Sequence, residues 1–242
     1  MYTLVFVEFY VFIKSLYQER KKLDNPVYHS LCETHQDKAL EYKGVKFYDP
    51  AYCSFGGVID PLVKAKDLAN YAQLVSDFFI VGTALVFDTS LILVEELVCL
   101  QMVLDSPIDL IPKEEIVPLE SKAQKQALYE LVNYVQPGYF KQETSALGRY
   151  IGIYQDQQLV AVSGERMKMK GFTEISAIVT HPDYTGRGYA KQLIKHCTQN
   201  IFEEGKTPYL HVVESNVAAI NLYENLGFFT RRKISFWKLA KI

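Results

Sequence analysis

The chain has 242 residues, 49% of them hydrophobic, which is enough to bury one large core or two ordinary ones. Its 26 basic and 28 acidic residues give a formal net charge of −2, so it lacks the bulk positive charge that attracts nucleic acid or an anionic membrane. The four cysteines show the spacing of neither a zinc site nor a disulfide framework, which favours a reducing, cytoplasmic location. We therefore expect no nucleic acid, membrane or metal as a partner.

The first 105 residues contain predicted elements but no chemical motif. Asn25-Pro26 is expected to break the first helix, because proline removes a backbone donor and clashes with the preceding turn. The apolar opening, residues 1–13, contains Glu8 and is too short to span a bilayer, so we interpret it as a buried strand or helix start, or as an upstream start-codon artefact. We predict helices over residues 12–22 and 61–76, and strands over 78–87 and 91–104, the last of which could be helical in part.

The second half of the chain shows clearer periodicity. Ser121 followed by Gln124 forms a capping-box pattern, which predicts a helix that ends at Gln136-Pro137-Gly138. An antiparallel meander is predicted next, with strands over residues 149–154, 159–167 and 172–180. The remaining predicted elements are a helix over 190–201 ended by Gly205, a strand over 209–213, a helix over 217–226, and one or two strands over 228–239.

Three prolines between Ser106 and Pro118 mark the best candidate for a domain boundary. No repeat, low-complexity tract or Gly/Ser linker offers another position. We predict an N-terminal α/β domain of unassigned function over residues 1–113 and a second domain over residues 114–242. The alternation of strands and helices indicates an α/β protein.

The most informative segment is the loop from Thr185 to Ala190, which lies between a predicted strand and a predicted helix. A helix N-terminus carries unpaired N–H groups and a partial positive charge, and glycines such as Gly186 and Gly188 let the backbone approach a bound anion closely. A pyrophosphate would fit such a loop. Glycines at a strand-to-helix turn also occur as ordinary turn residues, so the neighbouring sequence has to separate the two interpretations.

Two segments, EISAIVTHPDYTGRGYAKQLI and SNVAAINLYENLGF, resemble the two signature segments of GNAT acetyltransferases in order and in separation. The resemblance covers roughly residues 115–242. It implies a GNAT fold with a mixed sheet, acetyl-CoA as co-substrate, and transfer of the acetyl group to a primary amine by direct attack, with a small-molecule or peptide acceptor left open. By the same analogy, residues 1–113 could form a degenerate second GNAT-like domain, although no motif there matches.

The resemblance also assigns the cofactor-binding residues. The edge of the strand over 172–180 would pair with the pantetheine arm where it splays from the strand over 209–213. Thr185 stands where the family has glutamine or arginine, so one phosphate contact would be missing, with Arg187 available nearby. The implied cofactor-binding residues are Ile178, Val179, Thr180, Thr185, Gly186, Arg187, Gly188, Tyr189, Ala190, Lys191, Asn216 and Tyr223.

Acyl transfer to an amine needs a neutral amine, a donor for the developing oxyanion and a proton for the departing thiolate. The resemblance implies that Tyr223, seven residues after Asn216, is the acid that protonates the thiolate. The alternative is that Tyr223 belongs to the core face of its helix. The base is left open between Glu174, which stands thirteen residues before Arg187, His211 and an ordered water.

Several features stay unassigned. Arg149, Tyr150, Glu165 and Arg166 could line the acceptor side or form solvated strand faces. One rival function is a non-catalytic acyl-CoA sensor or interaction module, which would keep the phosphate loop and need no acid. A second is a transferase that takes its acyl group from an aminoacyl-tRNA, which the acidic charge balance disfavours. The sequence specifies neither the acyl-chain length nor the oligomeric state.

Overall fold

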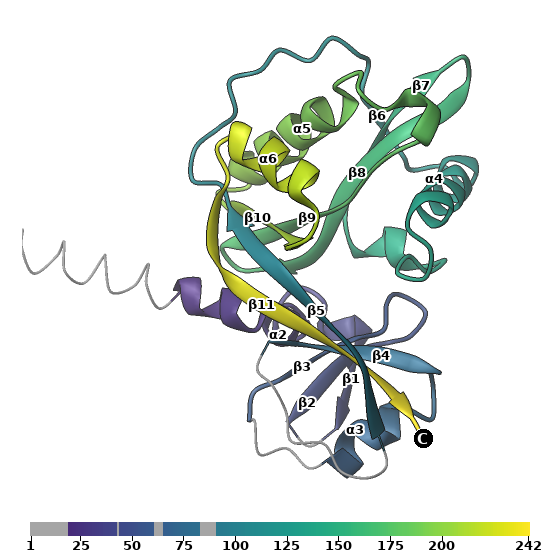
Figure 1. Cartoon of the computed structure of the whole chain (residues 1–242), viewed down its shortest axis with the longest axis vertical. Coiled ribbons are helices and arrows are strands. Elements are labelled where there is room, and N and C mark those ends of the chain that lie inside the picture. The colour runs from purple at the N-terminus through teal and green to yellow at the C-terminus, as the bar shows by residue number, and fades with distance from the viewer. Residues whose placement is uncertain (1–18, 43, 61–64, 83–90) are drawn as a thin grey trace, which may run out of the picture.

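The computed structural model describes residues 19–42, 44–60, 65–82 and 91–242. Their strands form one mixed sheet of 11 strands, in the order β1-β2-β3-β4-β11-β5-β10-β9-β8-β7-β6 (Figure 1). The predicted α/β class with a mixed sheet is thereby confirmed. In the described ranges no helix is long and apolar enough to cross a membrane.

The N-terminal part packs short strands and helices around a core of aromatic rings. Phe47 and Tyr71 stack with ring centroids 4.0 Å apart, and Phe78 meets both rings edge to face. Such stacked and edge-to-face pairs stabilise a core beyond the area that they bury. The elements are α2 (Pro26–Cys32), β1 (Ala39–Tyr42), β2 (Val45–Tyr48), β3 (Phe55–Val58), α3 (Ala65–Tyr71) and β4 (Asp77–Gly82).

The N-terminal predictions are corrected in part. Asn25-Pro26 starts a helix: the Asn25 side chain accepts a hydrogen bond from the Tyr28 N–H, and Pro26 fills the first turn, where its missing N–H costs nothing. The predicted helix over 61–76 is shorter, because the chain tightens into i→i+3 turns after Tyr71. Three predictions fall wholly or partly outside the described residues: the opening segment 1–13, most of the helix over 12–22 and the end of the strand over 78–87. Within the described part of the second, Lys21–Asp24 form a 3₁₀ turn.

The second half matches its predictions closely. The Ser121 capping box is present, with hydrogen bonds in both directions between Ser121 and Gln124. The antiparallel meander is confirmed by the β7–β8 and β8–β9 pairings, and the C-terminal residues form a single strand. The elements are β5 (Leu91–Val103), β6 (Val117–Pro118), α4 (Lys122–Val135), β7 (Tyr150–Gln155), β8 (Gln158–Met169), β9 (Phe172–Thr180), α5 (Tyr189–Glu203), β10 (Thr207–Val213), α6 (Val217–Asn225) and β11 (Phe229–Lys241).

Two long strands connect the halves of the molecule. β5 lies between β10 and β11, and β11 pairs with β4 along its C-terminal end (Figure 1). Strands from before and after the boundary predicted at residues 113/114 are therefore hydrogen-bonded to each other. The division into two domains stays a prediction. A degenerate GNAT-like origin of residues 1–113 also stays a prediction. All four cysteines are free.

A buried polar cluster strengthens this connection. Ser30 on α2 donates a hydrogen bond to the carbonyl of Lys168 on β8, 2.9 Å away, and His35 Nε2 donates to the carbonyl of Leu147, also 2.9 Å away. The His35 Nδ1 atom then accepts, with the Tyr48 hydroxyl 2.8 Å away. Burial lowers the pKa of His35 to about 4. The imidazole is therefore neutral at neutral pH and contributes to packing between the two halves.

Candidate active site

The sheet opens between β9 and β10. These parallel strands pair over three residue pairs only, from Thr207 opposite Phe172 to Tyr209 opposite Glu174. Beyond Glu174 no described strand pairs with this edge of β9. An unpaired strand edge presents free N–H and C=O groups, which a bound extended ligand can use. The splay that the resemblance implied for these strands is therefore present.

A bulge in β9 turns the strand at the same place. Val179 pairs with Val162 and Ser176 with Gly164, so Ala177 and Ile178 together face Ser163 alone. Ala177 has φ of +51°, an uncommon value for a residue with a side chain. Bulges of this kind re-aim backbone groups and are frequent beside active sites. Here the bulge directs Ala177 and Ile178 into the opening.

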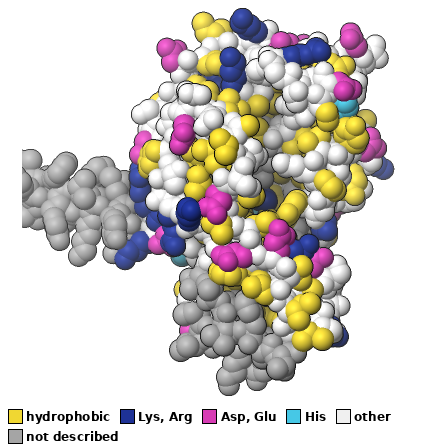
Figure 2. All heavy atoms as spheres, viewed as in Figure 1, with side chains coloured by type: hydrophobic (Ala, Val, Ile, Leu, Met, Phe, Trp, Pro, Cys, Tyr) yellow, Lys and Arg dark blue, Asp and Glu magenta, His cyan; other side chains and the backbone are white. Residues whose placement is uncertain are grey.

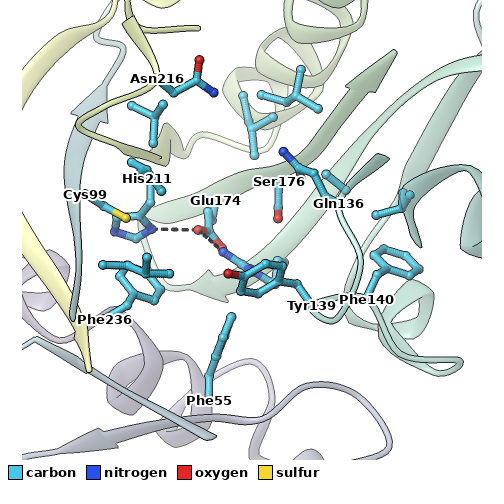
Figure 3. A pocket seen from close by; sticks show the side chains of 18 of the residues that line it. Phe55, Cys99, Gln136, Tyr139, Phe140, Glu174, Ser176, His211, Asn216 and Phe236 are labelled. Carbon is cyan, nitrogen blue, oxygen red and sulfur yellow. Dashed lines mark hydrogen bonds and ion pairs between the residues drawn. The ribbon is translucent and has the colours of Figure 1, made fainter. Parts of the chain in front are cut away.

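The opening leads into a cavity of about 320 Å³. Figure 2 shows a hollow in the middle of this face, with hydrophobic side chains gathered around it. Figure 3 shows the cavity from close by. Glu174, Ser176 and His211 converge in it from β9 and β10, with Asn216 at one end of the cavity and Phe55 at the other. Both halves of the chain contribute to the wall; its aromatic side chains are Phe55, Phe79, Tyr139, Phe140, Tyr223 and Phe236.

Glu174 lies at the floor of the cavity with every acceptor position filled. Its Oε1 accepts from Arg166 Nη2 and His211 Nδ1, both 2.8 Å away. Its Oε2 accepts from Arg166 Nε at 2.8 Å and from the Met167 N–H at 3.3 Å. Burial by itself would raise the pKa of Glu174, but the Arg166 charge and the hydrogen bonds from Arg166 and His211 outweigh it and lower the pKa to about 2. Glu174 is therefore a saturated carboxylate, which favours positioning of its neighbours over proton abstraction.

The tautomer of His211 follows from its neighbours. Gln101 Oε1 accepts from Arg231 Nη1 at 2.9 Å, and Gln101 Nε2 donates to the Leu23 carbonyl at 2.7 Å, so the orientation of the amide is fixed. The same Nε2 lies 3.1 Å from His211 Nε2 and can only donate to it. His211 Nε2 is therefore an acceptor, and its Nδ1 carries the proton that bonds Glu174. The lone pair of His211 is thus already engaged by Gln101.

Asn216 and Tyr223 approach the cavity from α6. Asn216 is the N-cap of this helix, where its side chain accepts from the Ala219 N–H at 3.2 Å. Tyr223 is 7% exposed, lines the cavity and donates to no described residue. Burial raises the pKa of Tyr223 to about 12, so its hydroxyl keeps its proton throughout the physiological range. The side chain both packs in the core and presents an unpaired donor, so the two interpretations made from the sequence are compatible.

The glycine loop lies at the N-terminus of α5. Gly186 and Gly188 both have φ of +76°, and Gly188 is the helix N-cap, so both positions favour glycine. Thr185 donates from its hydroxyl to the Pro182 carbonyl at 3.0 Å, and the exposed Arg187 guanidinium lies 4.7 Å from the centre of the Tyr184 ring. The loop is ordered by its own contacts, and Gly186 and Arg187 are exposed.

The other sequence-predicted residues lie in three environments. Tyr189 and Val179 bury their side chains in the core, which leaves only their backbone groups for a ligand. Thr180 and Ala190 are half-buried, and Lys191 is exposed beside Gly188. Among the described residues no group of His, Cys, Asp or Glu could hold a metal ion.

The four unassigned residues divide between two faces. Arg166 lines the cavity, 4.8 Å from the centre of the Phe55 ring. Glu165 points the other way, where Arg149 and Lys168 pair with it at 2.6 Å each. Tyr150 is buried, and its hydroxyl has no hydrogen-bond partner among the described residues. Successive side chains of a strand point to opposite faces of the sheet, so the alternation predicts that one of Glu165 and Arg166 faces inward.

Sequence reasoning missed two polar residues. Gln101, on β5, carries no local signal, since its partners lie in distant segments. Gln192, on α5, accepts from the backbone N–H groups of Lys113 and Glu114 at 2.6 and 2.9 Å and so holds the connecting segment against the helix that begins at the glycine loop. A buried glutamine on an otherwise apolar helix face was the available signal for Gln192.

Comparison with known proteins identifies the family of the chain. The family model described as FR47-like protein matches residues 150–237. A protein assigned to the GNAT family of acetyltransferases, from Novosphingobium aromaticivorans, is 30% identical, with a TM-score of 0.81 over 91% of this chain and 98% of the other. No curated protein matches the sequence.

Two further solved structures share the fold. A GCN5-related N-acetyltransferase from Kribbella flavida is 14% identical, with a TM-score of 0.61 over 89% of this chain and 93% of its own. A GCN5-related N-acetyltransferase-like protein from Streptococcus suis is 14% identical, with a TM-score of 0.62 over 91% and 97%. The chain belongs to the GNAT family, and this fold supports an acyltransferase role.

Proposed function

We propose that the protein transfers an acetyl group from acetyl-CoA to a primary amine by direct attack. The observation that carries the proposal is the fork between β9 and β10, which opens at Glu174 into a cavity lined by Ile178, Asn216 and Tyr223. The glycine loop follows β9 and precedes α5, so one continuous segment supplies both the strand edge and the anion site. We also propose a cytoplasmic location, in line with the free cysteines.

In this proposal the cofactor binds by backbone groups. The pyrophosphate would lie against the amides from Gly186 to Ala190, where the N-terminus of α5 favours negative charge. Thr185, Arg187 and Lys191 would flank it. The pantetheine arm would pair with the free edge of β9 at Ile178, Val179 and Thr180, and Asn216 would contact it from α6.

The chemistry needs a donor for the oxyanion and a proton for the thiolate. Backbone N–H groups at the β9 bulge would donate to the oxyanion. Tyr223 would donate from its hydroxyl to the departing sulfur. Since a thiol has a pKa of about 8.5 and Tyr223 one of about 12, the donation is a strong hydrogen bond, and the proton that the attacking nitrogen releases to water balances the one that the departing sulfur takes up.

A solvent water is the base that the contacts favour. Both oxygens of Glu174 are filled, and the Nε2 lone pair of His211 is held by Gln101. Glu174 and His211 stay alternative candidates for the base. In this proposal they instead hold Arg166 and each other in position. The neutral fraction of the acceptor amine is the species that attacks, so the water has only to accept the proton that the nitrogen releases.

The experiment combines binding and turnover. Acetyl-CoA should raise the melting temperature by mass action, and an amine panel should release free CoA thiol in its presence. Binding without transfer to any amine would favour the non-catalytic acyl-CoA sensor. Absence of a thermal shift at millimolar acetyl-CoA would overturn the proposal. Transfer from a charged tRNA instead would favour the aminoacyl-tRNA-dependent transferase.

A further inference from the structure

Arg166 has hydrogen-bond donors to spare inside the cavity. Its Nε and Nη2 atoms bind Glu174, but no described residue accepts from its Nη1. The buried and unpartnered side-chain atoms in the described ranges are Tyr150 OH and Thr173 Oγ1, so Nη1 is accessible. The side chain of Arg166 is 15% exposed and lines the cavity. A guanidinium fork with free N–H groups is suited to a carboxylate.

Glu174 cannot serve as a matching anchor for a cation. Each of its oxygens already accepts two hydrogen bonds. Arg166 and Glu174 are the charged residues among the described side chains that line the cavity. An acceptor that enters therefore meets unpaired donors on Arg166 and no free carboxylate.

Aromatic rings surround this polar group. Phe55 lies against the Arg166 guanidinium, and Phe236 contacts both Phe55 and His211, with ring centroids 5.8 and 5.2 Å apart. Tyr139 and Phe140 line the cavity from the loop after α4. These rings suit an apolar or aromatic body of the acceptor. A cavity of about 320 Å³ is at the small end of ligand pockets, which span about 300–1,000 Å³, and so suits a small molecule.

The spacing along β9 sets the length of the acceptor. The transferred acetyl group would lie at the level of Ile178, four residues beyond Glu174. Because the bulge sets Ala177 and Ile178 opposite Ser163 alone, the sheet advances by about three residues over this span, which gives ~10 Å at ~3.3 Å per residue. The acetyl group and the side chains fill part of this distance. The amine and the group bound by Arg166 are then separated by several bonds, which an α-amino acid does not provide.

We propose that the acceptor is a small ω-amino carboxylate, in which an apolar or aromatic spacer separates the amine from a carboxylate that binds Arg166. The inference rests on the proposed acetyl transfer and names its substrate class. The neutral amine attacks the thioester carbonyl carbon and the C–S bond breaks. The nitrogen releases one proton to water, the thiolate takes one up and leaves as free CoA thiol, and the amide product keeps the carboxylate unchanged on Arg166.

Matched pairs of amines test the carboxylate. Turnover with acetyl-CoA is measured for 4-(aminomethyl)benzoate against benzylamine and for 6-aminohexanoate against hexylamine, with phenylalanine as an α-amino acid. A charge-assisted hydrogen bond contributes about 1.5–3 kcal/mol, so kcat/KM should be about tenfold to a hundredfold higher for each carboxylate. Equal values within both pairs, or phenylalanine as the best member, would overturn the inference while leaving acetyl transfer intact.

Variants locate the effect. Arg166→Lys keeps a positive charge beside Glu174 but loses the planar fork, so the ratio within each pair should fall toward one. Arg149→Lys is the matched control, since it makes the same change at a guanidinium that pairs with Glu165 on the face turned away from the cavity and should leave both ratios unchanged. Melting curves and the acetyl-CoA thermal shift report whether each variant is folded. An unchanged ratio in Arg166→Lys would contradict the assignment.

Binding provides a readout that does not need turnover. Calorimetry with CoA present should show 4-(aminomethyl)benzoate binding to the wild type and more weakly to Arg166→Lys. No binding in either protein would overturn the inference. If hexanoyl-CoA is a better donor than acetyl-CoA and its advantage is lost in Phe55→Trp, the cavity holds the acyl chain instead. If acetyl-CoA itself does not bind, it is the proposed function that fails.

Discussion

The carboxylate of Glu174 and the guanidinium of Arg166 meet in two parallel hydrogen bonds of 2.8 Å, on neighbouring strands at the floor of the cavity. Glu174 is 1% exposed, so its charge is compensated almost entirely by protein groups. Breaking one partner of such a pair leaves the other charged and buried, which is costly even where the intact pair adds little to stability.

We expect Glu174→Gln to lose stability at neutral pH and little at acid pH. The pKa of Glu174 falls from 4.5 to about 2 on folding, so its contribution is fully present above pH 4.5 and is lost as the pH falls toward about 2. The shift corresponds to a contribution on the order of 3 kcal/mol. Urea unfolding of both proteins between pH 7 and pH 3 measures it. The exposed Glu224→Gln serves as the control, and a wild-type advantage of constant size across this range would contradict the expectation.

The Gln101 amide predicts the tautomer of His211. Because Gln101 donates to Nε2, the wild type should show an Nδ1–H imidazole in ¹⁵N spectra of the ring nitrogens. Gln101→Leu removes this donor and also leaves Arg231 without one acceptor. The variant should show a changed tautomer equilibrium at His211, whereas the His35 signals should stay as they are. A wild-type Nε2–H tautomer would overturn the derived orientation.

Local signals account for most of the second half of the fold. The capping box at Ser121 and the alternation along β7, β8 and β9 depend on neighbours in sequence, and each was predicted. The pairing of β5 with β10 and β11 joins residues more than a hundred positions apart. Strand propensity indicates that such segments pair, but not with which partner, so the link between the halves could not be predicted.

The candidate site divides in the same way. Its proposed cofactor side comes from a motif, whose residues Asn216 and Tyr223 line the cavity, and their binding of a cofactor stays a prediction. The aromatic wall that we propose for the acceptor is assembled from Phe55, Phe79 and Phe236, whose segments carry no chemical pattern. The saturation of Glu174 depends on Arg166 and His211 at once, and only the folded chain brings both within 2.8 Å.

Replacement of Gly188 tests the anion loop. Gly188→Val should abolish the thermal shift produced by acetyl-CoA, because a side chain would obstruct the amides at the start of α5. The backbone strain at φ of +76° should also cost roughly 1–2 kcal/mol.

Gly205→Val provides the control for that strain. Gly205 has φ of +69° and open space around it, just after the other end of α5. This variant should lose similar stability and keep the acetyl-CoA shift. If both variants respond equally to acetyl-CoA, the loop does not bind the cofactor.

Tyr223→Phe tests the proton donor. Phenylalanine keeps the ring in the core, so stability and acetyl-CoA affinity should change little. Turnover should fall on the order of tenfold to a thousandfold, which is the usual contribution of a general acid or a little less. Because burial raises the pKa of Tyr223 to about 12, its hydroxyl stays protonated and the deficit should be the same from pH 7 to pH 10.

Tyr154→Phe, a half-buried position outside the cavity, should retain wild-type kinetics. A deficit that disappears as the pH rises through 9 would mean that Tyr223 titrates there and is less buried than its contacts indicate. An unchanged turnover at every pH would leave Tyr223 with its packing role, and the thiolate would then depart with a proton from water.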